Sequence, residues 1–387
     1  MNRLFYLFSL LWCGLFCGVL QAATVDGLYE AEVPIAKQSD SERDRALPMA
    51  LQKVLIKVTG QHQLDDRTVE RLSRQAKRLT RQFRFHTNPA WQEYQAKLAT
   101  PTAPAWQSTS DDEVDESETE PVMIPEPYLL WVKFDMALVN QMLVEHDLPI
   151  WGKERPAVLL WLLIDQQGER TIVGGEALLV IQAEIKRYSE QRGVPLWLPL
   201  LDLEDQRSIT VSDLSGNFVE PIIDASQRYR ADVVVLGRLK ALDSGSWQAR
   251  WNLYDGAEQQ ALYGEHQGVE AGLAEGLDQL LDQLAQRYAQ RLDPSQARRV
   301  VMRVHGVADL AGYARVSEYL SGLDNVKKLY LREVAEQALL IELELLGEVA
   351  VMEQLLALGK RLRPVTVLEG ENSEFGAERV LNYRLMP

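Results

Sequence analysis

The sequence has very little cysteine and histidine. It holds two cysteines in 387 residues, Cys13 and Cys17, and both lie in an apolar segment near the N-terminus. Its five histidines are far apart and never stand at the i, i+4 spacing of a helical zinc pair. Cleavage of the N-terminal segment would leave a chain without disulfides or thiolate metal sites. We therefore expect no bound metal or cofactor, and a fold stabilised by apolar burial.

The motifs of several enzyme classes are also missing. No glycine-rich turn of the phosphate-binding kind is present, and Ser215 lacks the flanking glycines of a nucleophile elbow. Carboxylate pairs such as Glu342 and Glu344 fit a solvated strand face in a chain with 56 acidic residues. The sequence thus predicts no catalytic, cofactor-binding or metal-binding residue, which favours a protein that is not an enzyme.

Basic residues are outnumbered by acidic ones, giving a formal net charge of −15 at pH 7. This charge argues against nucleic-acid binding. One stretch departs from it: the three- and four-residue spacing of Val69, Leu72, Ala76, Leu79 and Phe83 predicts a single helix with basic side chains on its other faces. These basic residues are Arg67, Arg71, Arg74, Lys77, Arg78, Arg81 and Arg84.

This basic surface has three interpretations. Arg67, Arg71, Arg74, Arg78 and Arg81 form a candidate interaction surface for an anionic envelope component or an envelope protein. The same charges could be covered by the chain's own acidic segment, and a solvated helix face is the third interpretation.

Only one long apolar run occurs. It extends from Leu4 to Leu20, follows the basic residue Arg3 and ends at the small residues Ala22 and Ala23. This order is typical of a secretory signal peptide, which we assign to residues 1–22, and it predicts a periplasmic protein with no integral membrane segment after cleavage. The alternative is an inner-membrane protein anchored by the uncleaved segment.

The remaining chain predicts three units of the α/β and α+β classes. An N-terminal α+β domain spans residues 23–148 and contains an acidic disordered loop at residues 100–127, rich in proline and serine. A central mixed α/β domain follows at residues 149–294. In residues 298–387 the order β-α-β-β-α-β predicts a ferredoxin-like domain, followed by a further strand-like stretch that pairs with one of the sheets.

The central domain contains a buried strand followed by an alternating one. Val233 to Leu236 form a continuous apolar run that begins with three β-branched valines, and from Trp247 onward large apolar residues alternate with polar ones. Trp247, Ala249, Trp251 and Leu253 share one face, and Gln248, Arg250, Asn252 and Tyr254 share the other. Trp247 and Trp251 line either a ligand groove or the core, and the polar residues opposite favour the core.

Four stretches together resemble a known family. They are the N-terminal signal segment, "RALPMALQKVLIKVTG", "WGKERPAVLLWLLID" and "ADVVVLGRLKALDSGSWQARWNLYDG". The combination resembles the secreted Gram-negative family catalogued as domain of unknown function number two thousand and sixty-six, over nearly the whole mature chain. That resemblance implies no activity and no catalytic residue.

The central domain is also similar, more loosely, to the amino-terminal domain of the Tol-Pal translocation protein and to periplasmic flagellar-assembly modules. In those proteins an α/β domain serves as a docking platform, and the likeness is one of fold. The sequence therefore predicts an uncharacterised periplasmic binding or assembly module of the cell envelope. A periplasmic hydrolase that uses carboxylates near the tryptophan-rich central sheet is the alternative.

Overall fold

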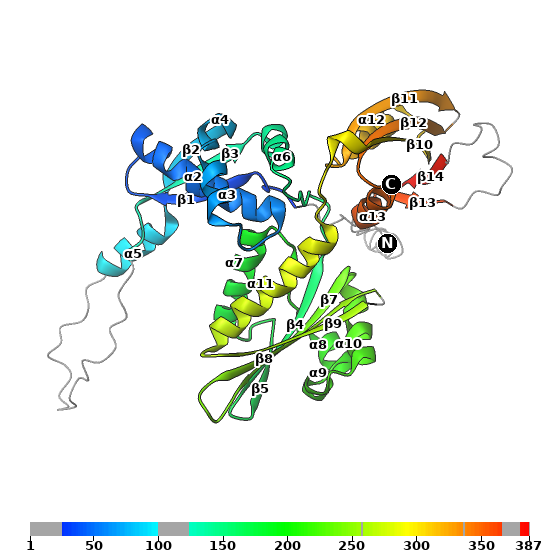
Figure 1. Cartoon of the computed structure of the whole chain (residues 1–387). Helices are drawn as coiled ribbons and strands as arrows, with labels where there is room; N and C mark the ends of the chain where they lie inside the picture. Colours follow the sequence, from blue (N-terminus) through cyan, green and yellow to red (C-terminus); the bar gives the residue numbers. More distant parts are fainter. Residues whose placement is uncertain (1–24, 100–123, 257, 336, 366–379, 387) are drawn as a thin grey trace, which may run out of the picture.

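The computed structural model describes residues 25–99, 124–256, 258–335, 337–365 and 380–386. Over these residues the molecule is a mixed α/β protein with three sheets and twelve α-helices (Figure 1). The sheets follow one another along the chain, and each has its own large hydrophobic cluster. The signal peptide assigned to residues 1–22 and residues 100–123 of the acidic loop lie outside the described residues. The domain limits at 148, 294 and 298 stay predictions.

The first sheet has three antiparallel strands in the order β1-β3-β2. Their bounds are β1 (Glu30–Ile35), β2 (Thr80–Thr87) and β3 (Tyr128–Phe134). The helices of this part are α2 (Asp40–Thr59), α3 (Asp66–Ser73), α4 (Ala76–Leu79), α5 (Pro89–Ala99) and α6 (Met136–Glu145). Ser39 caps the N-terminus of α2, and Gly60 ends it in the left-handed conformation at φ 71°.

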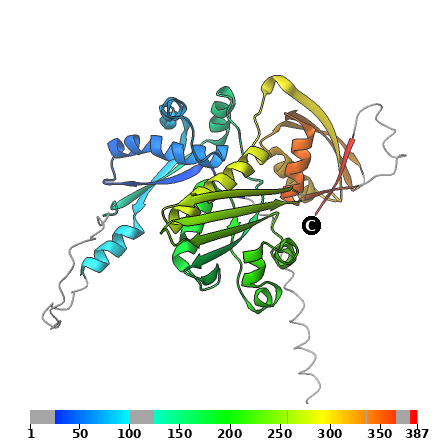
Figure 2. The same ribbon diagram turned by 60° about the horizontal axis from the view of Figure 1, so that its bottom comes forward.

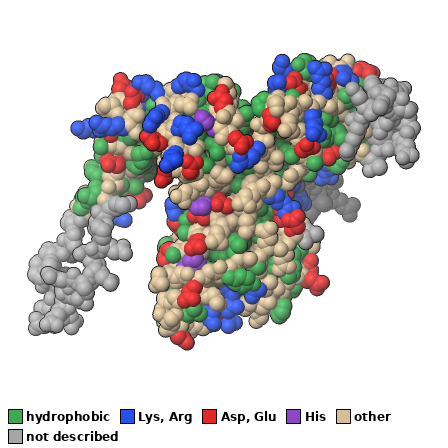
Figure 3. Space-filling view, in the orientation of Figure 1, with side chains coloured by type: hydrophobic (Ala, Val, Ile, Leu, Met, Phe, Trp, Pro, Cys, Tyr) green, Lys and Arg blue, Asp and Glu red, His purple; other side chains and the backbone are tan. Residues whose placement is uncertain are grey.

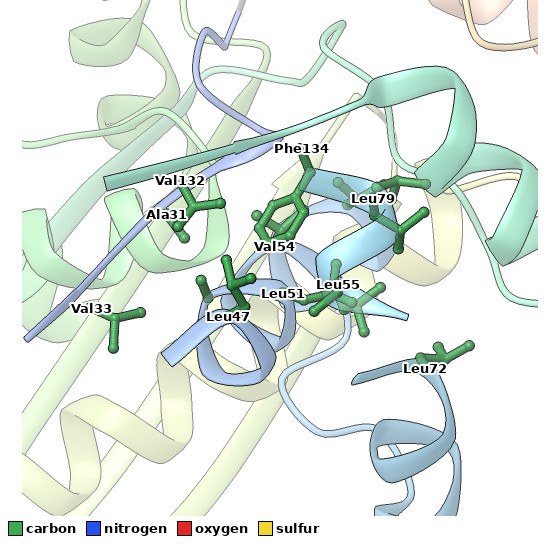
Figure 4. Packing of buried hydrophobic residues seen from close by; sticks show 14 of the residues in the cluster. Ala31, Val33, Leu47, Leu51, Val54, Leu55, Leu72, Leu79, Val132 and Phe134 are labelled. Carbon is green, nitrogen blue, oxygen red and sulfur yellow. The ribbon is translucent and has the colours of Figure 1, made fainter. Parts of the chain in front are cut away.

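Helix α2 supplies most of the first core. Its apolar residues recur every three or four positions, so one side of the helix faces the sheet. Leu47, Leu51, Val54 and Leu55 are buried against Val132 and neighbouring strand residues (Figure 4).

The second sheet combines parallel and antiparallel pairing in the order β5-β4-β7-β8-β9. Strands β4 and β7 are parallel, whereas β7, β8 and β9 form an antiparallel meander, and the short β6 pairs with the start of β4. The buried strand at Val233 thus leads into a hairpin, as its sequence predicts. The bounds are β4 (Val158–Gln166), β5 (Glu169–Val173), β6 (Leu196–Trp197), β7 (Val233–Ala241), β8 (Trp247–Asp255) and β9 (Glu258–His266).

Helices cover both faces of the second sheet (Figure 2). Helices α7 and α11 pack on one face with Trp251, and α9 and α10 pack on the other with Trp161 and Tyr254. The elements are α7 (Leu179–Arg192), α8 (Leu203–Ser208), α9 (Val211–Gly216), α10 (Val219–Ser226), the 3-10 helix Gln227–Tyr229 and α11 (Val269–Tyr288). The likeness of this fold to the Tol-Pal translocation protein stays a prediction.

The third sheet has five strands in the order β11-β12-β10-β14-β13. Its helices α12 and α13 supply buried residues to one cluster with the strands. The elements are the 3-10 helix Pro294–Gln296, β10 (Ala297–His305), α12 (Leu310–Ser321), β11 (Val326–Ala335), β12 (Ala338–Leu346), α13 (Val349–Gly359), β13 (Leu362–Pro364) and β14 (Val380–Leu385).

This sheet departs from the ferredoxin-like arrangement expected for residues 298–387. The element order β-α-β-β-α-β is present, but β13 does not pair with β10. Strand β14 lies between them, parallel to β10 and antiparallel to β13. The sequence predicts a strand-like stretch here, and only long-range pairing places β14 inside the sheet, where Leu381 and Tyr383 are buried.

Candidate functional site

The predicted basic helix over residues 67–84 is wrong in its second half. Arg67 and Arg71 lie on α3, Arg78 lies on α4, and the chain then becomes strand β2, which carries Arg81. Helical spacing holds as far as Leu79. Beyond it, pairing with β3 overrides the local pattern, and Phe83 is 39% exposed rather than buried.

Several of these basic side chains have partners close by. Arg74 forms an ion pair with Glu70, Lys77 forms one with Asp44, and Arg78 donates to Gln75. Figure 3 shows Lys and Arg side chains interspersed with Asp and Glu over this part of the molecule. The stretch is thus a mixed-charge surface over several elements, and its role as an interaction surface stays a prediction.

Trp251 lies in the core of the second sheet. It is 2% exposed, and it packs between Gly237 of β7 and Gly276 of α11. Trp247 is half-buried beside the same cluster. A ligand in solvent therefore cannot reach the side chain of Trp251.

The polar face opposite Trp251 is itself partly buried. Asn252 and Tyr254 are 2% and 6% exposed, and the Tyr254 hydroxyl donates to Oδ1 of Asn217 over 2.6 Å. Short helices cover this end of the face as well, so the buried Tyr254 hydroxyl has its hydrogen-bond partner inside the protein.

A large open cleft lies between the first and second sheets. Its volume is about 1040 Å³, and its walls come from β1, α2 and the C-terminal end of α7. Apolar groups such as Met49, Ile56 and Trp131 line it beside charged ones. The sequence did not point to this cleft, because its walls come from separate parts of the chain.

Two lysines of α2 reach the outer edge of β1 in this cleft. Nζ of Lys53 donates to the carbonyl of Glu32 over 2.7 Å, and Nζ of Lys57 donates to the carbonyl of Glu30 over 2.9 Å. Burial lowers the pKa of both amino groups, since it disfavours their charged form. Neither amino group has a carboxylate within ion-pair distance among the described residues.

Arg155 connects segments that line the cleft. Its side chain is buried, and its nitrogens donate to carbonyls at the C-terminal ends of α2 and α7 and in the connecting segment. These acceptors are the carbonyls of Lys57, Arg192, Gly193, Trp151 and Gly152. Helix C-termini carry partial negative charge, which explains how a guanidinium without a carboxylate partner can be buried here. Burial lowers the pKa of Arg155 to about 9, so the side chain stays charged at neutral pH.

The contacts that Arg155 makes between α2, α7 and the connecting segment are called the junction below. Two carboxyl groups with raised pKa lie beside this junction and not in the cleft. Burial raises the pKa of Glu154 and of Asp324. Asp324 accepts from Nδ2 of Asn140 over 3.1 Å, whereas Oε1 of Glu154 has no hydrogen-bond partner among the described residues. Neither side chain lines the cleft. Because catalytic acids need access to a substrate, their position gives the cleft no acid of this kind.

Two further searches of the described residues bear on chemistry and on membranes. Over these residues no three or more His, Cys, Asp or Glu side chains gather in a way that could hold a metal ion. Within the same ranges, no helix has both the length and the apolar character needed to cross a bilayer.

Comparisons with known proteins give a partial match. A family model described as a domain of unknown function (DUF8605) matches residues 22–152. The sequence also resembles a family of unknown function. The family that matches has a different designation, and its match covers about a third of the chain. No curated protein matches the chain.

One solved structure is also similar, a crystal structure of an uncharacterized protein with 12% sequence identity. The alignment covers 35% of this chain and 92% of that chain, with a TM-score of 0.17, too low to support an inference about fold or function. The first third of the chain is therefore similar to a domain of unknown function, and the comparisons assign it no activity.

Proposed function

We propose that the protein is a non-enzymatic binding or assembly module of the cell envelope, exported by its N-terminal segment and acting in the periplasm. The observation that carries this proposal is the cleft between the first and second sheets. Its size suits a segment of a partner molecule, and it presents the amino groups of Lys53 and Lys57, which are committed only to backbone carbonyls.

The hydrolase alternative has less support. It requires carboxylates near the tryptophan-rich sheet that are open to substrate. Asp165 is buried and paired with Arg170 and Arg238, and Asp255 forms an ion pair with Arg287. With their charges engaged in this way, these carboxylates serve better as structural anchors than as catalytic groups.

Site-specific photo-crosslinking in intact cells tests the proposed function. Met49 lines the cleft and is 54% exposed, so a photoreactive amino acid at this position would contact a bound partner. Leu310 on α12 is 80% exposed and serves as the control position. We expect a discrete adduct in the periplasmic fraction from position 49 and none from position 310. The same products from both positions, or none from position 49, would contradict the proposal.

A further inference from the structure

Strand β2 forms an open edge of the first sheet. In the order β1-β3-β2 it pairs with β3 alone, and no second strand pairs with it among the described residues. After an irregularity next to Thr80, its register with β3 is regular from Gln82 to Thr87. A regular edge strand has a row of unpaired backbone N–H and C=O groups, which can pair with a further strand.

The aromatic side chains of β2 show that this edge is incompletely covered. Phe83 lies opposite Val132 of β3, so it shares the face of the sheet that packs on α2. Phe83 is nevertheless 39% exposed, although it contacts Phe85 and the guanidinium of Arg43. A strand added beside β2 would place its own side chains against these rings.

Basic side chains without an acidic partner gather at this edge. The sequence of β2 contains arginine and histidine but no aspartate or glutamate. Arg81, Arg84 and, at the end of α4, Arg78 are exposed, and within the described ranges none of them has a carboxylate at ion-pair distance. Arg78 donates to Gln75, and the guanidinium of Arg84 lies over the ring of Trp131.

Most carboxylates of this part of the molecule are held by other basic side chains. On α2, Asp44 forms ion pairs with Arg43 and Lys77. Glu32 reaches across from β1 and contacts His86 of β2, so one carboxylate lies near the three arginines without a paired lysine or arginine of its own. Three positive charges against one negative charge leave the edge basic, even when His86 is neutral.

We propose that β2 binds an extended segment of a partner protein in which acidic and apolar residues alternate, added to the sheet as a fourth strand. Backbone hydrogen bonds to the open edge hold the segment. Because Phe83 and Arg84 lie on opposite faces, apolar residues of the segment cover Phe83 while its carboxylates meet Arg84. This inference goes beyond the proposed function, since the cleft borders β1 at the opposite edge of the sheet.

The same charges argue against a second copy of this chain at the edge. Two β2 strands side by side would bring the arginines of both copies together, and like charges on neighbouring strands are unfavourable. Basic side chains on an edge strand thus prevent self-pairing. A segment that carries acidic residues meets the opposite condition, because each of its carboxylates lies near an arginine.

Fluorescence anisotropy tests the inference with the full-length mature protein. The probe is a labelled peptide of alternating glutamate and valine, and the comparison peptide has lysine in place of glutamate. We expect the glutamate peptide to bind at least tenfold more tightly. Its affinity should fall as salt is added, because part of the binding is ionic.

Two N-methylated forms of the probe test pairing through the backbone. One form is methylated on the glutamates and the other on the valines, and each methyl group removes one N–H donor. In an added strand only alternate N–H groups face the neighbouring strand. We therefore expect one form to lose at least tenfold in affinity and the other to bind like the unmodified probe.

Variants of the two arginines assign the binding to β2. Arg81→Gln with Arg84→Gln should weaken binding at least tenfold, whereas Arg81→Lys with Arg84→Lys should keep most of it. The control is Arg315→Gln with Arg363→Gln, which replaces exposed arginines of α12 and β13 and should bind like the parent. Circular dichroism shows whether each variant is folded. If the glutamine pair does not fold, Arg78→Gln tests the charge outside the strand and should weaken binding severalfold.

Three results would overturn the inference. They are equal binding of the glutamate and lysine peptides, unchanged binding by a folded glutamine pair, and equal affinities of the two N-methylated forms. Selective binding to vesicles of anionic phospholipid in place of the peptide, lost in the glutamine pair, would replace the protein segment with a lipid surface.

The acidic stretch of the chain itself is the remaining competitor. Peptide binding that occurs only after this stretch is neutralised would assign the edge to the stretch and overturn the role of a partner. The neutralised variant carries Asp111→Asn, Asp112→Asn, Glu113→Gln, Asp115→Asn and Glu116→Gln. The adduct from position 49 tests the proposed function separately, because that position lines the cleft and not the edge at β2.

Discussion

At the scale of single residues, the junction beside the cleft has an unusual buried acid. Glu154 is 3% exposed and one of its oxygens lacks a hydrogen-bond partner among the described residues. Burial raises its pKa, and Asp324 raises it further, while Lys153 and Arg361 act in the opposite direction. The folded protein thus holds a proton on Glu154 more tightly than the unfolded chain does.

This shift predicts how stability depends on pH. An acid with a raised pKa contributes stability that is present below its unfolded pKa and is lost as pH rises through its folded pKa. Glu154→Gln removes the cost of burying the charge, so we expect a higher midpoint of thermal unfolding at pH 7 to 8. The gain should shrink toward pH 4, where glutamate is itself protonated. Melting curves across this range provide the measurement.

Glu344 provides a matched control, because its pKa is shifted in the opposite direction. The hydrogen bond from Lys327 lowers the pKa of Glu344, so its charged form is favoured in the folded state. Glu344→Gln should therefore give no gain at neutral pH. A Glu154→Gln variant that melts below the parent at pH 8 would contradict the raised pKa of Glu154 in the folded protein.

At the scale of elements, the contact between α11 and β8 depends on small residues. A Cβ on Gly276 would lie 2.0 Å from Nε1 of Trp251, and a Cβ on Gly237 would lie 2.4 Å from the same indole. The helix and the neighbouring strand β7 thus approach Trp251 as closely as glycine permits. This packing requires glycine at position 276, in the middle of a helix, where glycine is otherwise unfavourable.

This packing predicts that Gly276→Ala destabilises the protein. In an exposed helix the substitution would gain about 1 kcal/mol, but here the clash with Trp251 should cost about 1 to 3 kcal/mol. The loss should be smaller in the background of Trp251→Phe, which shortens the ring system. Urea unfolding of the two single variants and the double variant measures this coupling. Independent effects of the two substitutions would show that Gly276 and Trp251 are not in contact.

At the scale of the whole molecule, one arginine connects the first two sheets. Arg155 joins the C-terminal ends of α2 and α7, which also form walls of the cleft. Further links run between the first and second units, such as the amide of Trp151 to the carbonyl of Val58 over 2.6 Å. Asn140 and Asp324 similarly link the first unit to the third.

Replacement of this arginine should loosen the whole junction. Arg155→Met removes the donor of five backbone carbonyls, four of them in buried hydrogen bonds, so we expect a loss of at least about 3 kcal/mol. Scanning calorimetry should show the variant melting at a lower temperature with a broader or divided transition. Arg298→Met, which removes an exposed ion pair with Glu348, is the control and should melt close to the parent. A cooperative transition at the parent's temperature in Arg155→Met would contradict this role.

The sequence by itself determined much of the local structure. The apolar run at Val233 and the alternation after Trp247 indicated strands β7 and β8, and apolar residues every three or four positions mark the buried side of α2. These signals are strong because each element buries a regular face, and a regular face leaves a repeat in the sequence.

Tertiary structure alone decided the rest. Pairing with β3 turned the second half of the predicted basic helix into β2, and long-range pairing placed β14 between β10 and β13. The cleft and the role of Arg155 have no local signal, because their contacts join residues far apart in the chain: 98 positions separate Arg155 from Lys57. A sequence pattern records which face of an element is buried, and only the packing of whole elements decides which residues from distant segments meet.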